Sequence, residues 1–76
     1  MAKENESADS VYKVVEVIGT SKKSWAEAGR NAVERAAGTL RDLRVAEVVK
    51  LDMTVDGKGK VKAYRARVAL SFKYEE

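Results

Sequence analysis

The stretch VAEVVKLDMTVDGKGKVKAYRARVALSFKY, residues 45–74, decides the fold because two alternating segments flank a short turn. Residues 45–55 and 61–74 place alternate side chains in two separate sets, as strands do when one face of a sheet is covered. The sequence DGKG between them, residues 56–59, is typical of a tight turn. We therefore predict a long antiparallel hairpin.

Strict alternation also predicts which side chains of the hairpin share a face. In the first strand, one face is predicted to carry Val45, Glu47, Val49, Leu51, Met53 and Val55. In the second strand, one face is predicted to carry Tyr64, Ala66, Val68, Leu70, Phe72 and Tyr74. Both strands exceed the usual length of about five or six residues, so a single helix is too short to cover them.

A third strand and a helix are predicted ahead of the hairpin. Residues 11–18 are rich in β-branched side chains and predict a strand that ends at GTS, residues 19–21. Ser24 and Glu27 have the spacing of a capping box, which predicts a helix over residues 25–40. Its apolar stripe consists of Trp25, Ala28, Gly29, Ala32, Val33, Ala36 and Leu40. This order indicates an α+β fold with a three-stranded antiparallel sheet packed on one helix.

The composition restricts the chemistry that the chain can carry out. The 76 residues include no cysteine and no histidine. Disulfides are therefore excluded, and zinc sites and serine–histidine catalysis are nearly excluded. No other pairing of a nucleophile with a base is visible in the sequence, so we predict a protein that is not an enzyme.

The ends and the charge of the chain bear on its location and partners. Residues 1–10 lack hydrophobic periodicity and predict a disordered tail ahead of one domain, residues 11–76. No apolar segment typical of a signal peptide or a membrane span is present, so we expect a cytoplasmic protein without a membrane partner. The net charge of +3 is not concentrated in a basic stripe with aromatic residues, so no nucleic-acid partner is expected. A binder of anions or nucleic acid would instead use Lys58, Lys60, Lys62, Arg65 and Arg67.

The short length of the chain favours self-association. A domain of this size buries only about 60% of the surface that its unfolded chain exposes. Small scaffolds usually compensate with disulfides, a metal or a partner subunit, and disulfides are impossible here. We therefore predict that the chain associates with other copies of itself.

From Val11 to Tyr74 the sequence resembles the dodecins. The resemblance is carried by VYKVVEVIGTS at residues 11–21, by the alanine-rich helix, and by LRVAEV at residues 43–48. It implies a β-α-β-β subunit and a hollow spherical homododecamer. It also implies that the shell binds a flavin (riboflavin or FMN) between its subunits. The flavin would be stored or sequestered there, without catalysis of a reaction.

The same resemblance implies a ligand pocket at Val45, Glu47, Asp52 and Arg65. In flavin-binding dodecins a tryptophan stands at the position of Val45, commonly an arginine at that of Asp52, and a glutamine at that of Arg65. Without an aromatic partner at this position, the stacking energy of about 0.5–1.5 kcal/mol is lost. The slot that would hold the flavin ring also loses its shape. A carboxylate at Asp52 in place of a base reverses the charge and favours a cation.

The chain is similar in particular to the calcium-binding branch of the dodecins, through Arg44-Val45-Ala46 and DMTVD at residues 52–56. This similarity implies calcium, which oxygen atoms coordinate, and makes Asp52 and Asp56 candidate metal ligands. Copies of one carboxylate that converge in a symmetric shell repel each other unless a cation joins them. The favoured hypothesis is a non-enzymatic homododecamer that binds and stores calcium. The alternatives are a flavin store and a shell without a ligand.

Overall fold

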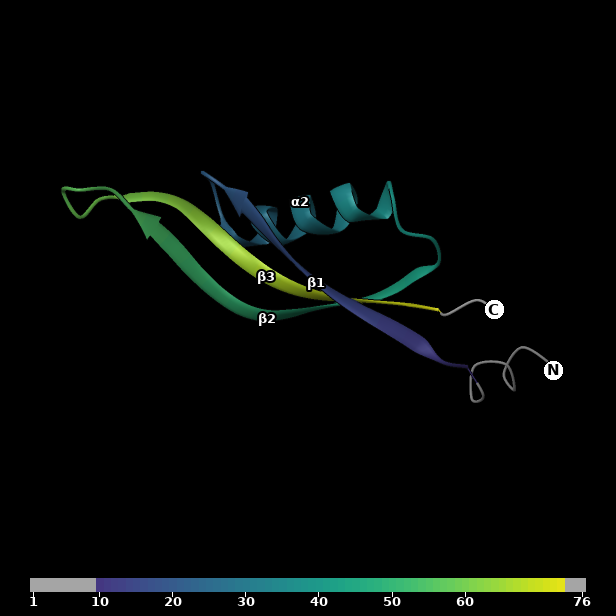
Figure 1. Ribbon diagram of the computed structural model, residues 1–76. Coiled ribbons are helices and arrows are strands. Elements are labelled where there is room, and N and C mark those ends of the chain that lie inside the picture. The colour runs from purple at the N-terminus through teal and green to yellow at the C-terminus, as the bar shows by residue number, and fades with distance from the viewer. Residues whose placement is uncertain (1–9, 74–76) are drawn as a thin grey trace.

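The computed structural model describes residues 10–73 of the chain. Strand β1 (Tyr12–Ser21) is followed by helix α2 (Trp25–Ala37) and by strands β2 (Leu43–Val55) and β3 (Val61–Lys73) (Figure 1). The predicted β-α-β-β order is therefore confirmed. The predicted N-terminal tail lies outside the described residues except for Ser10, and so does Tyr74, which was predicted to continue the last strand.

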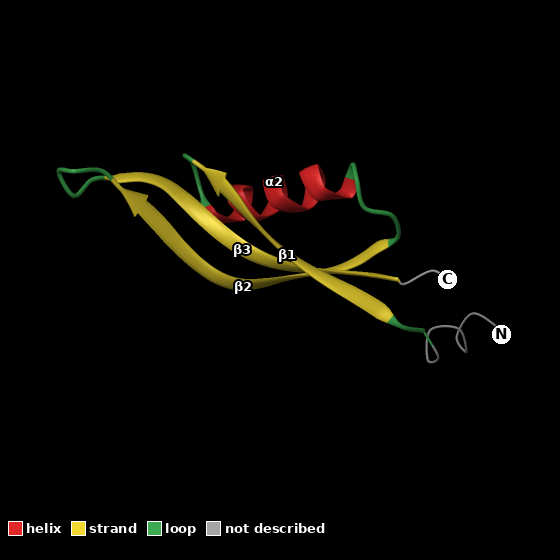
Figure 2. Ribbon diagram, in the orientation of Figure 1, coloured by secondary structure: helices red, strands yellow, loops and turns green. Residues whose placement is uncertain are grey.

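The three strands form one antiparallel sheet in the order β1-β3-β2, with the helix against one side (Figure 2). The hairpin partner β2 and the N-terminal strand β1 both pair with β3, which is therefore central. The backbone edges of β1 and β2 have no further strand beside them within residues 10–73. Such edges offer N–H and C=O groups to other chains.

The N-terminus of α2 shows one of the two hydrogen bonds of the predicted capping box, the one made by the side chain of Ser24. The Ser24 hydroxyl accepts the backbone N–H of Glu27 at 3.0 Å, as a capping serine does. The Glu27 carboxylate accepts a hydrogen bond from the Ser21 hydroxyl at 3.0 Å, which ties the helix to the end of β1.

The helix ends earlier than predicted, at Ala37 instead of residue 40. The N–H of Gly38 reaches the carbonyl of Arg35 at 3.2 Å, which is the tightened spacing common at helix ends. Glycine is a poor helix former, and the chain turns there toward β2.

Gly19 lies inside β1, which continues through residues 19–21 to Ser21, three residues beyond the predicted strand of residues 11–18. These residues continue the ladder with β3, up to the pairing of Ser21 with Tyr64. A Cβ atom at Gly19 would collide with the carbonyl oxygen of Ala28 and lie 2.9 Å from the Cβ of Ala32. The glycine therefore serves the close approach of helix and strand and not a turn.

The core is small and lies between α2 and β3. It consists of Ala28, Ala32, Ala66, Val68 and Leu70, each of which is 6% exposed or less. The three β3 residues belong to the face predicted to be apolar, and both alanines belong to the predicted helix stripe. Small side chains at the contact bring the helix close to the sheet.

Large apolar side chains remain exposed on or beside all three strands. They are Val11, Tyr12, Val14, Val15, Ile18, Val45, Val48, Val49, Leu51, Met53, Val55 and Val61. Because α2 packs mainly on β1 and β3, most of β2 has no covering element within residues 10–73. No helix in this range is long and apolar enough to cross a membrane.

The prediction that every second residue of β2 shares one face is wrong. The register with β3 shifts between Val48 and Lys50, where Val49 forms a bulge. Before the bulge Glu47 pairs with Ala69, whereas after it Leu51 pairs with Ala66, whose side chain is buried under α2. One extra residue exchanges the two sides of a strand, so Leu51 and Met53 lie on the opposite side from Val45 and Glu47.

Candidate ligand-binding face

The four predicted pocket residues lie together on the side of the sheet away from α2, which we call the open face. The register pairs Val45 with Ser71, Glu47 with Ala69 and Asp52 with Arg65. These β3 residues alternate with Ala66, Val68 and Leu70, which are buried under the helix, so they point the other way. In an unbroken strand Val45 and Asp52 would lie on opposite sides. The bulge at Val49 brings them to the same one.

Asp52 and Arg65 form a two-point ion pair on this face. Arg65 Nε donates to Asp52 Oδ1 at 2.7 Å, and Arg65 Nη2 donates to Oδ2 at 2.9 Å. The hydrogen bond from Arg65 is the main cause that lowers the pKa of the Asp52 carboxyl, and the pKa of Arg65 is raised in turn. Both groups are partly exposed, so water screens their attraction. The Asp52 carboxylate is therefore ionised, and both of its oxygens are engaged.

Trp25 holds the backbone of Asp52. Its indole Nε1 donates to the Asp52 carbonyl at 2.9 Å, and its ring meets that of Tyr64 edge-on with centroids 5.0 Å apart. Residues 27 positions apart in the chain are joined by this bond. Sequence analysis missed the contact, because nothing in the spacing of Trp25 and Asp52 indicates that they meet.

Val45 and Glu47 offer different chemistry on the open face. Val45 is 55% exposed and presents only aliphatic carbon, so it cannot stack on a flavin ring as an aromatic side chain does. Glu47 is exposed, and no hydrogen bond or ion pair of its side chain is found in the described part of the chain. The donor set of this face therefore fits a flavin poorly.

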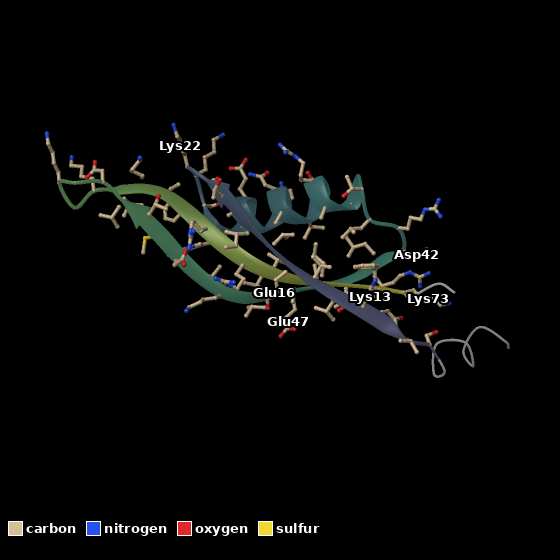
Figure 3. All side chains as sticks on the ribbon, in the orientation of Figure 1. Lys13, Glu16, Lys22, Asp42, Glu47 and Lys73 are labelled. Carbon is tan, nitrogen blue, oxygen red and sulfur yellow. The ribbon has the colours of Figure 1, made fainter. Side chains whose placement is uncertain are left out.

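A second carboxylate lies across the central strand from Glu47. Glu16 on β1 and Glu47 on β2 both pair with Ala69, and Figure 3 shows the two side chains on the side of the sheet away from α2. Glu16 accepts a longer contact from Arg67 Nη1, at 3.4 Å. Asp52, Glu47 and Glu16 thus supply oxygen donors on one face, which is the chemistry that calcium requires.

Asp56 lies in the hairpin turn. Its Oδ1 accepts the backbone N–H groups of Lys58 at 2.8 Å and Lys60 at 3.0 Å, and these bonds lower the pKa of the Asp56 carboxyl. These two hydrogen bonds stabilise the turn, so Asp56 has a structural role in the hairpin. Between residues 10 and 73 no three acidic side chains gather closely enough to hold a metal ion. The described acidic side chains of one subunit therefore do not form a metal site by themselves.

A separate open groove of about 1100 Å³ lies between β1 and α2. Its lining includes the apolar side chains of Val15, Val17 and Leu40. It also includes Asn31, whose side chain donates to the Thr20 carbonyl at 3.0 Å. None of the predicted pocket residues lines it.

Comparison with known proteins gives one consistent family. The family model described as Dodecin matches residues 11–75. A calcium dodecin of Mycobacterium tuberculosis is 50% identical over 64 residues, which are 84% of this chain and 89% of that protein. A dodecin of Thermus thermophilus is 39% identical over 66 residues, which are 87% of this chain and 94% of that protein.

Solved structures agree with this result. The crystal structure of the Mycobacterium tuberculosis calcium dodecin superposes with a TM-score of 0.76 at 48% identity, covering 87% of this chain and 93% of the other. It is described as a calcium-chelating antigen with a novel calcium-binding site. The structure of dodecin from Streptomyces coelicolor gives a TM-score of 0.82 at 38% identity, covering 91% of this chain and 97% of the other.

Proposed function

Because the chain belongs to the dodecin family, we propose that it forms a hollow homododecamer that binds and stores calcium and catalyses no reaction. The observation that carries the proposal is the open face, where Asp52 and Glu47 present carboxylates and Val45 stands in place of a stacking aromatic. The name of the Mycobacterium relative, a calcium dodecin, supports the same ligand.

The proposed cation site depends on assembly, because the described residues of one subunit supply too few acidic side chains to hold the ion. Calcium takes about 6–8 oxygen ligands, more than any described cluster of this chain supplies. In a symmetric shell, copies of Asp52 or Glu47 from several subunits meet around an axis, where a divalent cation offsets their repulsion. Asp56 is a weaker candidate, because its Oδ1 already accepts two backbone N–H groups.

Flavin storage, with riboflavin or FMN, is the second candidate function. It is favoured by the position of Val45, Asp52 and Arg65 on one face, as a shared pocket requires. It is disfavoured by the aliphatic side chain at Val45 and by the ion pair that occupies Asp52 and Arg65.

Two titrations of the assembled protein test these functions. Calorimetry with calcium is expected to show binding to the wild type and weaker binding to Asp52→Asn. The control Glu34→Gln, which neutralises an exposed carboxylate on α2, is expected to bind as the wild type does. Titration of riboflavin or FMN is expected to leave the flavin fluorescence unquenched. Tight flavin binding without any calcium heat would reverse the order of the two candidates.

Native mass spectrometry tests the assembly in the same preparation. A particle of twelve subunits is expected, and any retained ligand is weighed with it. A folded single subunit at both low and high protein concentration would contradict the proposed shell.

A further inference from the structure

The ion pair on the open face sets a condition for cation binding there. Both oxygens of Asp52 are held by Arg65, at 2.7 Å and 2.9 Å. A calcium ion needs lone pairs on the same oxygens, and its charge repels a guanidinium at that distance. A cation that binds the Asp52 carboxylate therefore competes with Arg65 for the same two oxygens.

The other carboxylates of the open face are held less firmly. Glu16 meets Arg67 through one contact of 3.4 Å, and Glu47 has no described partner. Two-point pairing with a guanidinium is stronger and more directional than a single contact. Of these three acids, Asp52 is the one that an arginine holds through both carboxylate oxygens.

The backbone of Asp52 is fixed from the opposite side of the sheet. Trp25 Nε1 donates to the Asp52 carbonyl at 2.9 Å, which holds the backbone of β2 at this residue. Both side chains are partly exposed, and Arg65 has the longer side chain with more rotatable bonds. The arginine is therefore the movable half of the pair.

From these contacts we infer that Arg65 is an internal competitor of the cation, and that it sets the affinity of the open face for divalent ions. This inference rests on the proposed calcium binding. Calcium occupies Asp52 when Arg65 swings out, and a doubly charged ion displaces the guanidinium more effectively than a singly charged one. Arg65 thus determines specificity without itself donating an atom to the metal.

Calcium titration of assembled variants tests the inference, with calorimetry and tryptophan emission as readouts. Trp25 is the only tryptophan of the chain, and its bond to Asp52 makes its emission a reporter of that site. Arg65→Gln is expected to bind calcium about tenfold more tightly than the wild type, because the positive charge is gone. Arg35→Gln, which removes an exposed positive charge on α2, is the matched control and is expected to change affinity less than about twofold.

Arg65→Lys keeps the charge without the two-point geometry and is expected to fall between wild type and Arg65→Gln. If Arg65→Gln does not assemble, the comparison of Arg65→Lys with the wild type serves as the test. Unchanged or weaker calcium binding in the Arg65 variants, with binding in the wild type, would overturn the inference and leave calcium binding standing. Absence of binding in the wild type and in every Arg65 variant would overturn the proposed function as well. Binding in Arg65→Gln alone would support the competition.

Discussion

Asp52 is held on both sides of the sheet at once. Its carboxylate meets Arg65 on the open face, and its carbonyl accepts the indole of Trp25 on the side of α2. The resemblance to the family predicted that Asp52 and Arg65 share a pocket, and the structure places both on the open face. The resemblance was not sufficient to show that they bind each other, because their pairing depends on a register that only the folded sheet defines.

The ion pair predicts a dependence of stability on pH. The pKa of Asp52 is lowered from its usual value of 3.8 by the hydrogen bond from Arg65, so folding favours the ionised carboxylate. The stabilisation is present above pH 3.8 and is lost as the pH falls through the lower, folded-state pKa. Wild type is therefore expected to be more stable than Asp52→Asn near neutral pH, and the gap is expected to close in acid.

Urea unfolding at fixed protein concentration, at about pH 6 and about pH 2.5, measures this gap. Glu34→Gln serves as the control and is expected to show no comparable change with pH. An equal gap at both pH values would contradict an ionised pair as its source.

At the scale of elements, the sequence predicts both strands of the hairpin, the helix and the N-terminal strand. The signals are the hydrophobic periodicity, the turn residues and the Ser24 cap. Two features escaped that reasoning for physical reasons. Gly19 is usual in turns, but here it serves the approach of α2, which is a tertiary contact. The bulge at Val49 has no signal of its own, because valine suits either side of an exposed edge strand.

Gly19→Ala tests the close contact of strand and helix. The added Cβ would meet the Ala28 carbonyl and the Ala32 side chain, so helix and sheet must move apart. Overpacking of this kind costs about 1–3 kcal/mol in the free energy of unfolding. Chemical denaturation measures it. Gly57→Ala, where a Cβ would have no neighbour within 4 Å, is the control and is expected to stay close to wild type.

At the scale of the whole molecule, the sheet is longer than the helix that covers it. The hairpin ends of β2 and β3 project beyond α2 in Figure 1, and apolar side chains of β2 are exposed on both faces. An exposed apolar surface of this kind is typical of a subunit within an assembly. The short sequence pointed to this conclusion through its size and missing disulfides, but it could not say which strand edges stay open.

Val48→Lys is expected to break the proposed shell. Val48 lies on the helix side of β2, is 54% exposed, and pairs with Val68 of the core strand. We expect another subunit to cover this apolar side chain, and a lysine there would bury a charge without a partner, which is costly. Analytical ultracentrifugation is expected to show small species. Ala37→Lys, at an exposed helix end, is the control and should sediment as the wild type does.

The bulge at Val49 determines which side of the sheet each residue in the outer part of β2 faces. Forcing Val49 into a regular ladder, with no residue removed, would turn the outer part of β2 over, so that Lys50 and Asp52 faced the helix and Leu51 and Met53 faced outward. The ligand chemistry of the sheet therefore depends on a residue that need touch no ligand. Building these side chains into another sheet would require a bulge at the same place in the strand.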